Sequence, residues 1–481
     1  MKTQYDIAIV GAGVVGSFIA YELSRYRLKI ALIDKESDVG LGTSCRNSGV
    51  LHAGFYYPTG SLKARLCVEG NSLMKELQKY LQFPMKATGK LLVAFRKEEV
   101  EELHRLKEQG EANGVELELI KGESIGKLQP GIEAMMGMYS PNTAILSPYG
   151  ATIAAAETAA RNGVDVFLST EVKTVKKEGD FKLKTNNGTI RSRWLINATG
   201  VISDKFSSMV GVDGYKLYPC RGEYHILDKK LAPLVKMPIY PVPAKGVSGH
   251  LGVHITPTVE GPILIGPSAE YIDDPEDYSC TLPVMEKLFE EGYKLWPHFT
   301  RKDIIRAFSG IRAKPIPPGE KGFKDFIIKE DLPNFINLVG IESPGLTAAP
   351  AIAKMIKKMI EKKEKLTEKE NFDPYYRGVK RLEPLPEEEK ERLVRENPNY
   401  GEIICRCEKV TKQEILDAIN NPIGAKSLVG IKYRSRAMMG RCQGGYCLPK
   451  IVDIMEKEFG LKPHDFYLHK PESWMFGGRL R

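Results

Sequence analysis

The sequence lacks both a long apolar run and a concentration of charge of one sign. Nowhere does it approach the roughly 20 consecutive apolar residues of a membrane-spanning helix, which argues against an integral membrane segment and leaves peripheral attachment open. The net charge of +9 comes from 70 Lys and Arg against 61 Asp and Glu, spread along the chain rather than gathered into a basic stripe. We therefore expect no nucleic-acid partner, whereas a small anionic substrate fits this charge.

The N-terminus lacks the features of a targeting segment. MKTQYDIAIVGAG enters a strand pattern within a few residues and has no basic stretch followed by an apolar one. We therefore expect a cytoplasmic protein, whose cysteines are not a disulfide set. Internal repeats are also absent, and 481 residues exceed one compact core, so two or three domains are expected.

The first residues have the pattern of a dinucleotide-binding unit. An apolar strand pattern at 5–10 leads into G-x-G-x-x-G, formed by Gly11, Gly13 and Gly16, and a helical pattern follows. Such glycines permit a tight turn, close approach of a pyrophosphate and packing of the helix on the strand, with the helix N-terminus facing the phosphates. Asp34 ends the second strand pattern, where a carboxylate accepts hydrogen bonds from a ribose. The alternative is a glycine turn in another α/β protein.

Later segments favour FAD over a nicotinamide cofactor. WLINATG at 194–200 and VGIESPGLTAAP at 339–350 both predict strands that return to the same cofactor, and GLGTSCRNSG lies at 40–49. Together they resemble the flavoprotein family of D-amino acid oxidase, glycerol-3-phosphate dehydrogenase and L-2-hydroxyglutarate dehydrogenase, over residues 5–360. The resemblance implies an α/β protein: a Rossmann-like FAD-binding domain with an inserted, mostly antiparallel β substrate domain.

The resemblance also implies which residues contact FAD. In the family, the last strand–helix turn directs a helix N-terminus at the flavin C2 carbonyl, where it stabilises the negative charge of reduced flavin. Gly345, Leu346 and Thr347 occupy that turn here, and Val172 stands where the family's loop contacts the adenine. The remaining positions implied to contact FAD are Lys35, Thr43, Ser44, Arg46, Asn47, Ser48, Ala198, Thr199, Gly200, Gly310 and Gly340.

Two histidines are candidates for the catalytic base. The stretch RNSGVLHAGFYYPTGSLKARLCVEG at 46–70 closely resembles L-2-hydroxyglutarate dehydrogenases. The family reaction moves a hydride to flavin N5 while a base takes the hydroxyl proton, and His52 fits that role because histidine titrates near neutral pH. His254 is the second candidate. The structural alternatives are a flavin hydrogen bond for His52 and burial within a strand for His254.

Two arginines and a tyrosine complete the expected substrate site. Arg221 and Arg312 follow turns and are candidate anion clamps, because a guanidinium binds carboxylate or phosphate bidentately; a salt bridge is the alternative. Tyr57 is a candidate hydrogen-bonding partner of the substrate. Glycerol-3-phosphate dehydrogenases tend to carry an arginine where Tyr56 stands, and a lysine in the turn at 343–347, which has none here. These two missing cations favour a hydroxy acid.

Four cysteines near the C-terminus form two pairs with the spacing C-x-C, 34 residues, C-x4-C: Cys405, Cys407, Cys442 and Cys447. Four thiolates hold [2Fe–2S] or zinc, and C-x-C is unusual for zinc. The pattern resembles the bacterioferritin-associated ferredoxin-like domain, a small helical [2Fe–2S] module, with zinc as the alternative. Thr411 and Glu414 predict a capped helix start after the first pair.

Basic residues surround these cysteines, where they either dock an acidic partner or offset the charge of a cluster. They are Arg406, Arg434, Arg436 and Arg441.

Composition divides the chain into four parts. The segment 361–400 is dominated by Lys, Glu, Pro and Arg, which predicts a linker or a segment that wraps the surface. The expected parts are an FAD-binding and substrate domain at 1–360 (substrate part roughly 80–145 and 215–310), the charged linker at 361–400, the [2Fe–2S] domain at 401–460 and a tail at 461–481.

The resemblances leave the substrate open. A flavin fold joined to this cysteine module resembles the catalytic subunits of anaerobic glycerol-3-phosphate dehydrogenases. This layout makes oxidation of sn-glycerol 3-phosphate to dihydroxyacetone phosphate the leading hypothesis, with electrons leaving through the cluster to a second electron-transfer or flavoprotein subunit. L-2-hydroxyglutarate is the alternative substrate. An amino- or imino-acid dehydrogenase, or an electron-transfer subunit without its own substrate, is third.

Overall fold

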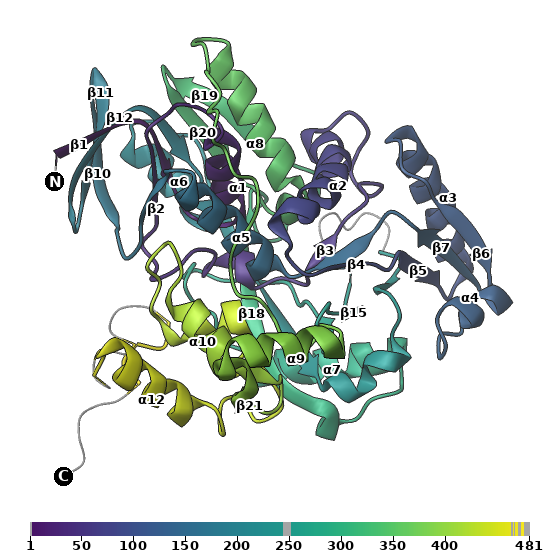
Figure 1. The fold of residues 1–481 in the computed structure, drawn as a ribbon. Coiled ribbons are helices and arrows are strands. Elements are labelled where there is room, and N and C mark those ends of the chain that lie inside the picture. Colours follow the sequence, from purple (N-terminus) through teal and green to yellow (C-terminus); the bar gives the residue numbers. More distant parts are fainter. Residues whose placement is uncertain (1, 244–251, 463–464, 466, 470–472, 476–481) are drawn as a thin grey trace.

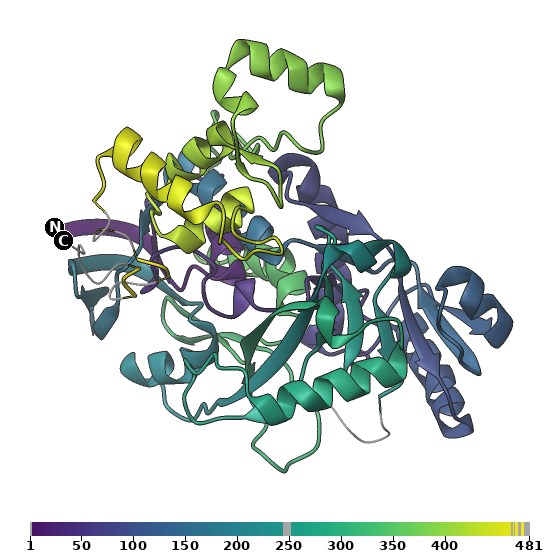
Figure 2. The ribbon, with the colours of Figure 1, turned by 90° about the horizontal axis from the view of Figure 1, so that it is seen from below.

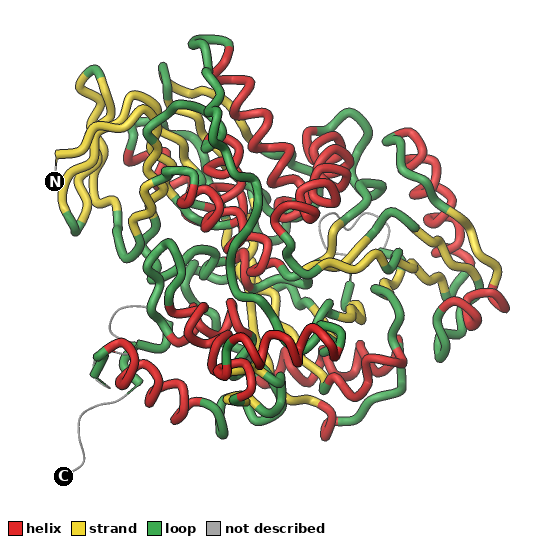
Figure 3. The backbone as a smooth tube through the Cα atoms, viewed as in Figure 1, coloured by secondary structure: helices red, strands yellow, loops and turns green. Residues whose placement is uncertain are grey.

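The computed structural model describes residues 2–243, 252–462, 465, 467–469 and 473–475 (Figure 1). These residues form two large β-sheets with covering helices, and a small helical unit near the C-terminus that contacts both sheet regions (Figure 3). The expected architecture, an α/β domain with an inserted β domain and a small helical C-terminal domain, is confirmed. Of the expected tail at 461–481, residues 463–464, 466, 470–472 and 476–481 lie outside the described part.

The first sheet has eight strands with a parallel centre. β1 (Lys2–Val10) lies between β2 (Ile30–Ile33) and β12 (Gly188–Asn197), and β9 (Asp165–Phe167) and β20 (Phe335–Val339) pair with β2 and β12. β2 and β20 are buried at every position, as expected for parallel strands covered on both faces. β10 (Val172–Glu178), β11 (Asp180–Thr185) and β19 (Ile327–Leu332) add antiparallel edges.

Successive residues of these strands point to opposite faces of the sheet and are apolar on both, so helices cover both faces. Ile7 and Ile9 of β1 belong to the core beneath α1 (Val14–Leu23), α5 (Pro148–Arg161) and α8 (Gly345–Glu361). Ala8 and Val10 face the opposite core, which includes Phe206 of α6 (Ser203–Met209). α2 (Leu62–Leu81) packs on α8.

The second sheet has nine strands and draws on two separate parts of the chain. β5 (Lys90–Ala94), β6 (Glu118–Lys121) and β7 (Met136–Ser140) come from the first part, and β13 (Tyr218–Leu227) to β18 (Ile304–Lys314) from the second. All its pairings are antiparallel except that of β5 with β14 (Ile239–Pro241). Segments from both expected substrate parts, 80–145 and 215–310, thus share one sheet. Its other strands and helices are β15 (His254–Pro257), β16 (Ile263–Gly266), β17 (Glu270–Tyr271), α3 (Lys97–Ala112), α4 (Gly122–Leu128) and α7 (Leu282–Leu295).

Short elements join these layers. They are the three-stranded sheet of β3 (Val50–Leu51), β8 (Ala144–Leu146) and β4 (Met85–Ala87), and the 3-10 turns η1 (Thr43–Cys45), η2 (Gly200–Ile202), η3 (Lys229–Leu234), η4 (Arg301–Asp303) and η5 (Pro398–Gly401).

The charged segment 361–400 lies along the first domain before it reaches α9 (Glu387–Glu396). The Arg27 N–H donates to the Thr367 carbonyl at 2.8 Å, and the Lys369 N–H donates to the Arg25 carbonyl at 2.7 Å. Figure 1 shows this stretch running from α8 down to the C-terminal unit. Its path along the surface is fixed by backbone hydrogen bonds.

The C-terminal unit is small and helical. It contains β21 (Ile403–Cys405), β22 (Val410–Thr411), α10 (Lys412–Ile419), α11 (Leu428–Ser435) and α12 (Leu448–Phe459). The predicted cap at the start of α10 is confirmed: the Glu414 N–H donates to the Thr411 hydroxyl, and the Glu414 carboxylate accepts from the Thr411 N–H. Figure 2 shows this unit and the projecting α9 from another side.

Buried ion pairs join the C-terminal unit to the FAD-binding domain. The Arg434 guanidinium binds both oxygens of Asp38 and, at 2.6 Å, Glu157 of α5, and each of these side chains is at most 2% exposed. Arg436 binds Glu408 at 3.1 Å and the Tyr149 hydroxyl at 2.7 Å. Both arginines therefore serve this contact within the chain rather than an external partner. Among the described residues, no helix is both long and apolar enough to cross a membrane.

Candidate functional site

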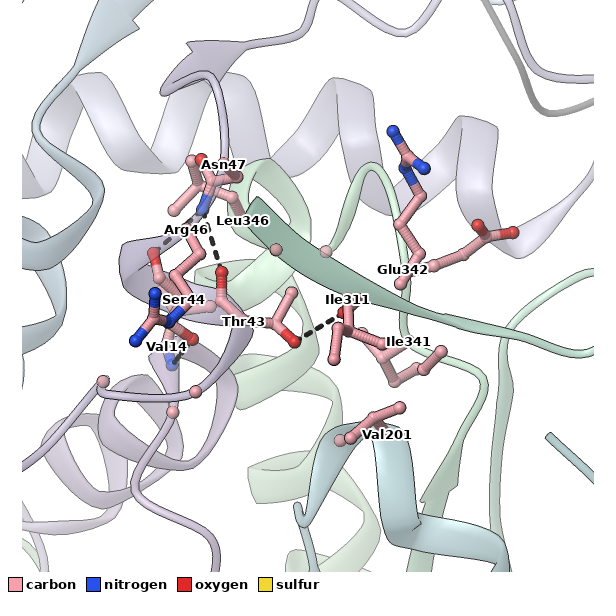
Figure 4. Close-up of a pocket in the computed structure, with 18 of the residues that line it drawn as sticks. Val14, Thr43, Ser44, Arg46, Asn47, Val201, Ile311, Ile341, Glu342 and Leu346 are labelled. Atoms are coloured by element: carbon pink, nitrogen blue, oxygen red, sulfur yellow. Dashed lines mark hydrogen bonds between the residues drawn. The ribbon is translucent and has the colours of Figure 1, made fainter. Parts of the chain in front are cut away.

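A cavity of about 560 Å³ is lined by residues from both large sheets (Figure 4). One end lies at the loop between β1 and α1, and the other reaches Tyr240 and His254 of the second sheet. The volume is within the range of small-molecule and cofactor sites, about 300–1,000 Å³.

The glycine loop at one end has no room for side chains. Gly11 has φ +104°, and a Cβ there would lie 2.3 Å from the Ala198 carbonyl oxygen. A Cβ on Gly16 would lie 1.9 Å from the Gly11 carbonyl oxygen, which is the close helix–strand packing predicted for the third glycine. Gly13 precedes α1 and faces the Ser44 hydroxyl. The loop thus brings bare backbone and a helix N-terminus to the cavity, as a pyrophosphate requires.

Asp34 lies at the carboxyl end of β2 and lines the same end of the cavity. Its carboxylate accepts hydrogen bonds from the Ala12 N–H at 2.6 Å and the Glu36 N–H at 2.9 Å. Burial nevertheless raises the pKa of Asp34 above its ordinary value. The two backbone donors fix this carboxylate beside the loop, where an adenosine ribose would lie.

The segment after β2 forms one long wall of the cavity. The Ser44 hydroxyl accepts from the Val14 N–H at 2.8 Å, and the Thr43 hydroxyl donates to the Ile311 carbonyl at 2.7 Å, which ties this wall to α1 and to β18 of the second sheet (Figure 4). A Cβ on Gly310 would lie 2.0 Å from the Arg46 carbonyl oxygen, so β18 approaches this wall closely only because the residue is glycine.

The N-terminus of α8 lies at the far end of the cavity. Gly345 and Leu346 line the cavity, and the buried Thr347 hydroxyl accepts from the His52 N–H at 2.9 Å. This places the positive end of the helix dipole where a reduced flavin would carry negative charge.

His52 is enclosed at this end. Burial, with a smaller effect of the nearby Lys90 cation, lowers the pKa of His52 to about 3. The imidazole is therefore neutral in the free protein and able to accept a proton, although it is a weaker base than the sequence led us to expect. An anionic substrate beside it would raise this pKa.

His254 belongs to a column of stacked side chains. Its ring lies 3.9 Å from the Tyr240 ring, nearly parallel, and its Nδ1 lies 2.8 Å from the Thr256 hydroxyl. The Lys90 ammonium lies 4.3 Å from the Tyr240 ring centre on a strand next to β14. Lys90 belongs to no recognisable motif, and its contact with Tyr240 depends on strand pairing, so it could not be predicted from the sequence.

The two candidate anion clamps differ in position. Arg312 lines the cavity, and its guanidinium donates to the Ser268 carbonyl at 3.0 Å. Arg221 does not line the cavity; it binds Glu223 at 3.2 Å, Asp277 and the Ser279 hydroxyl. Of these two arginines, Arg312 is the one placed to meet a ligand.

The remaining expected residues fall into two groups. The Tyr57 hydroxyl lies 3.3 Å from the hydroxyl of Ser343, a cavity residue, but Tyr57 itself does not line the cavity. Four other expected residues also lie outside the cavity lining: Gly16, Val172, Gly340 and Thr347. The expected residues that do line the cavity are Lys35, Thr43, Ser44, Arg46, Asn47, Ser48, Ala198, Thr199, Gly200 and Gly310. Cavity residues that the sequence did not single out include Val14, Glu36, Val201, Tyr240, Ile341 and His469.

The four C-terminal cysteines gather as two pairs. The sulfurs of Cys407 and Cys442 lie 3.6 Å apart. The Cys447 thiol donates a hydrogen bond to Cys405 and lowers the pKa of Cys405 to about 6. In the described part of the chain, no three His, Cys, Asp or Glu side chains surround one point closely enough for a single metal ion.

Four thiolates can hold one zinc ion or, as two pairs, the two irons of a [2Fe–2S] cluster. The helix N-terminus of α12, which begins directly after Cys447, favours the negative charge of such a cluster.

Comparison with known proteins agrees with both sites. Residues 6–359 match the family described as FAD dependent oxidoreductase, and residues 403–457 match the BFD-like [2Fe-2S] binding domain. A protein of Caloramator mitchellensis named glycerol 3-phosphate dehydrogenase is 40% identical over 99% of this chain and 98% of its own length. The mitochondrial L-2-hydroxyglutarate dehydrogenase of Caenorhabditis briggsae is 32% identical over 73% of this chain and 92% of its own.

A solved structure of a flavoprotein is also similar to this chain. The dithionite-reduced L-alpha-glycerophosphate oxidase of Mycoplasma pneumoniae with FAD bound has a TM-score of 0.72 and 29% identity, over 78% of this chain and 98% of its own. The glycine cradle, the helix N-termini and the cysteine pairs fit the two cofactors that these families bind. The chain belongs to the FAD-dependent oxidoreductase family and carries a BFD-like [2Fe–2S] domain.

Proposed function

We propose that this protein is an FAD-dependent dehydrogenase that oxidises sn-glycerol 3-phosphate to dihydroxyacetone phosphate. One observation carries the choice of substrate: the relative named glycerol 3-phosphate dehydrogenase aligns over 99% of this chain, cysteine domain included. The L-2-hydroxyglutarate relative aligns over 73% of it. Electrons leave through the [2Fe–2S] domain to a partner, which we take to be a second electron-transfer or flavoprotein subunit in the cytoplasm.

The residues around the cavity have separate roles in this reaction. Bound FAD supplies the hydride acceptor. Arg312 binds the anionic group of the substrate, because its guanidinium faces the cavity and no carboxylate within the described residues forms an ion pair with it. His52, neutral before substrate binds, accepts the hydroxyl proton, and the N-terminus of α8 stabilises negative charge at the far end.

L-2-hydroxyglutarate is the second candidate because the residues nearest the reaction resemble its dehydrogenases. Tyr56 stands where an arginine is usual in glycerol-3-phosphate dehydrogenases, and the turn before α8 has no lysine. Arg312 would bind a carboxylate as well as a phosphate.

Anaerobic bleaching of the bound flavin distinguishes these substrates. We expect a saturating concentration of sn-glycerol 3-phosphate to bleach the flavin absorbance. The enantiomer of this substrate should leave the absorbance unchanged. Bleaching by L-2-hydroxyglutarate alone would replace the leading substrate by the alternative, and bleaching by neither would refute both.

Replacement of His52 tests the base. His52→Ala should slow flavin reduction by about 10²–10⁴-fold, the usual contribution of a general base. His104→Ala is the matched control, because His104 is exposed on α3 away from the cavity. Equal reduction rates in His52→Ala and wild type would remove His52 from this role.

A further inference from the structure

The two cysteine pairs differ in their access to solvent. Cys405 and Cys447 are buried, with exposed fractions of 1% and 0%, whereas Cys407 is half-buried and Cys442 is exposed. A cluster held by these four residues would therefore have one inner side and one side that faces solvent at Cys442.

Two cations are fixed beside the exposed cysteine. The Arg406 guanidinium lies 4.4 Å, and the Lys450 ammonium 4.9 Å, from the centre of the Tyr446 ring. The Tyr446 N–H donates to the Cys442 sulfur. The aromatic ring thus holds both cations at the cysteine loop through cation–π contacts.

The basic side chains around Cys442 differ in how their charges are paired. Within the described part of the chain, neither Arg406 nor Lys450 forms an ion pair with a carboxylate. Arg441 is 70% exposed and pairs with Asp228, but Asp228 is only 11% exposed, so the positive charge is the part that reaches solvent. Arg406, Arg441 and Lys450 thus differ from Arg434 and Arg436, whose charges are paired in the buried contact with the FAD-binding domain.

We propose that the surface formed by Arg406, Arg441, Tyr446 and Lys450 around Cys442, the cation face, is the docking site of an acidic one-electron carrier protein. This rests on the proposed exit of electrons through the [2Fe–2S] domain. In each transfer the reduced cluster loses one electron, and the redox centre of the carrier gains it; no bond or proton is exchanged. Carboxylates around the carrier's centre would be steered to the cation face, and the partly exposed Tyr446 ring offers a contact of the kind enriched at protein interfaces.

The test uses the holoenzyme and an acidic plant-type ferredoxin as the probe. We expect the second-order rate of ferredoxin reduction by dithionite-reduced enzyme, freed of excess dithionite, to fall steeply with added salt. Cytochrome c, a basic carrier, should react slowly at low salt and faster as salt is added. A rate for ferredoxin that is independent of salt would overturn the proposal.

Charge reversal locates the surface. The triple variant Arg406→Glu/Arg441→Glu/Lys450→Glu should lower the ferredoxin rate at low salt by at least about tenfold, within the range of electrostatic steering. The matched control, Lys97→Glu/Lys121→Glu/Lys127→Glu, makes the same change in net charge on the exposed surface of α3, β6 and α4. Equal losses in the two variants would overturn the proposal, because they would assign the effect to net charge.

Two further measurements separate a loss of docking from a loss of turnover. Calorimetric binding of oxidised ferredoxin to each variant reports docking without turnover, and the neutral Arg406→Gln/Lys450→Gln pair replaces the triple variant if that variant loses its iron. Flavin bleaching by substrate is followed in parallel: its failure in wild type refutes the proposed function, whereas bleaching with salt-independent ferredoxin binding refutes only the docking site. Binding to vesicles of anionic phospholipid, without binding to ferredoxin, would also overturn it.

Discussion

The ammonium of Lys90 lies 4.3 Å from the centre of the Tyr240 ring, in a site where Lys90 is only 2% exposed. Phe55 covers the same ammonium at 4.6 Å, and Tyr240 stacks on His254, which lines the cavity. In the described part of the chain no carboxylate forms an ion pair with this cation. A buried lysine held by aromatic faces alone is costly to keep charged, and burial lowers the pKa of Lys90 to about 7.

This gives the stability a specific pH dependence. Because the pKa of Lys90 is about 7 in the folded protein and 10.5 in the unfolded chain, the unfolded chain holds more protons between these values. Stability should therefore rise with pH in this window for wild type relative to Lys90→Met, by up to about 1.4 kcal/mol per pH unit. Denaturant unfolding of both proteins at pH 6 to 10 measures the difference, and a difference that is constant with pH would contradict the assignment.

The same replacement should alter the catalytic pH profile. The Lys90 cation contributes to the low pKa of His52, so its removal raises that pKa. Burial is the larger cause, and Lys90 is the charged group among the described residues that lowers this pKa; the Asn71 amide and the Cys67 thiol donate to the His52 carbonyl. We expect the apparent second-order rate of flavin reduction to be flat at mildly acidic pH in wild type, with an acid limb that moves upward in Lys90→Met.

The two arginines of the substrate domain should respond differently to the same change. Arg312→Lys should raise the substrate dissociation constant by about 10–100-fold, because a bidentate charged contact is lost. Arg221→Lys should leave that constant nearly unchanged and lower stability, because it disturbs the pairing with Glu223 and Asp277. The amplitude of flavin bleaching against substrate concentration measures the first effect, and thermal unfolding measures the second. A similar rise of the constant in both variants would contradict this division.

The ion pairs at the domain contact make another prediction. Arg434→Met leaves Asp38 and Glu157 buried without their cation, which should cost about 3–5 kcal/mol of stability. The triple variant Arg434→Met/Asp38→Asn/Glu157→Gln should recover part of this loss, since the buried charges are gone. Arg392→Met on the exposed face of α9 is the control and should cost less than about 1 kcal/mol. Equal stabilities for Arg434→Met and this control would refute the role of the contact.

Metal content tests the cysteine centre. Cys442→Ser should reduce the iron and labile sulfide of anaerobically purified protein, whereas Cys280→Ser, at a cysteine distant in sequence from both pairs, should not. Zinc without iron in wild type would contradict the two-iron assignment.

Local patterns in the sequence predicted the parts of the fold that depend on neighbouring residues. The glycine loop follows from three glycines between a strand and a helix, and the Thr411–Glu414 cap from two residues at a fixed spacing. The general location of the FAD cavity followed from segments that resemble a known family. These features need little knowledge of how distant parts of the chain meet.

Contacts between distant segments could not be predicted in this way. Arg221 and Arg312 look alike in sequence, and only the approach of Asp277, 56 residues away, shows that Arg221 is already paired. Arg434 lies among basic residues near the cysteines, yet its partner Asp38 is 396 residues earlier. Lys90 reaches the substrate end only through the parallel pairing of β5 with β14.

The contact between Arg46 and His469 has a consequence for biosynthesis. Their side chains lie 3.3 Å apart at the cavity, although 423 residues separate them in the chain. During translation, the Rossmann-like core leaves the ribosome long before His469 does. FAD that binds a nascent chain would therefore meet a cavity that lacks this part of its wall, and retention of the cofactor should tighten only after the iron–sulfur domain has been made and docked.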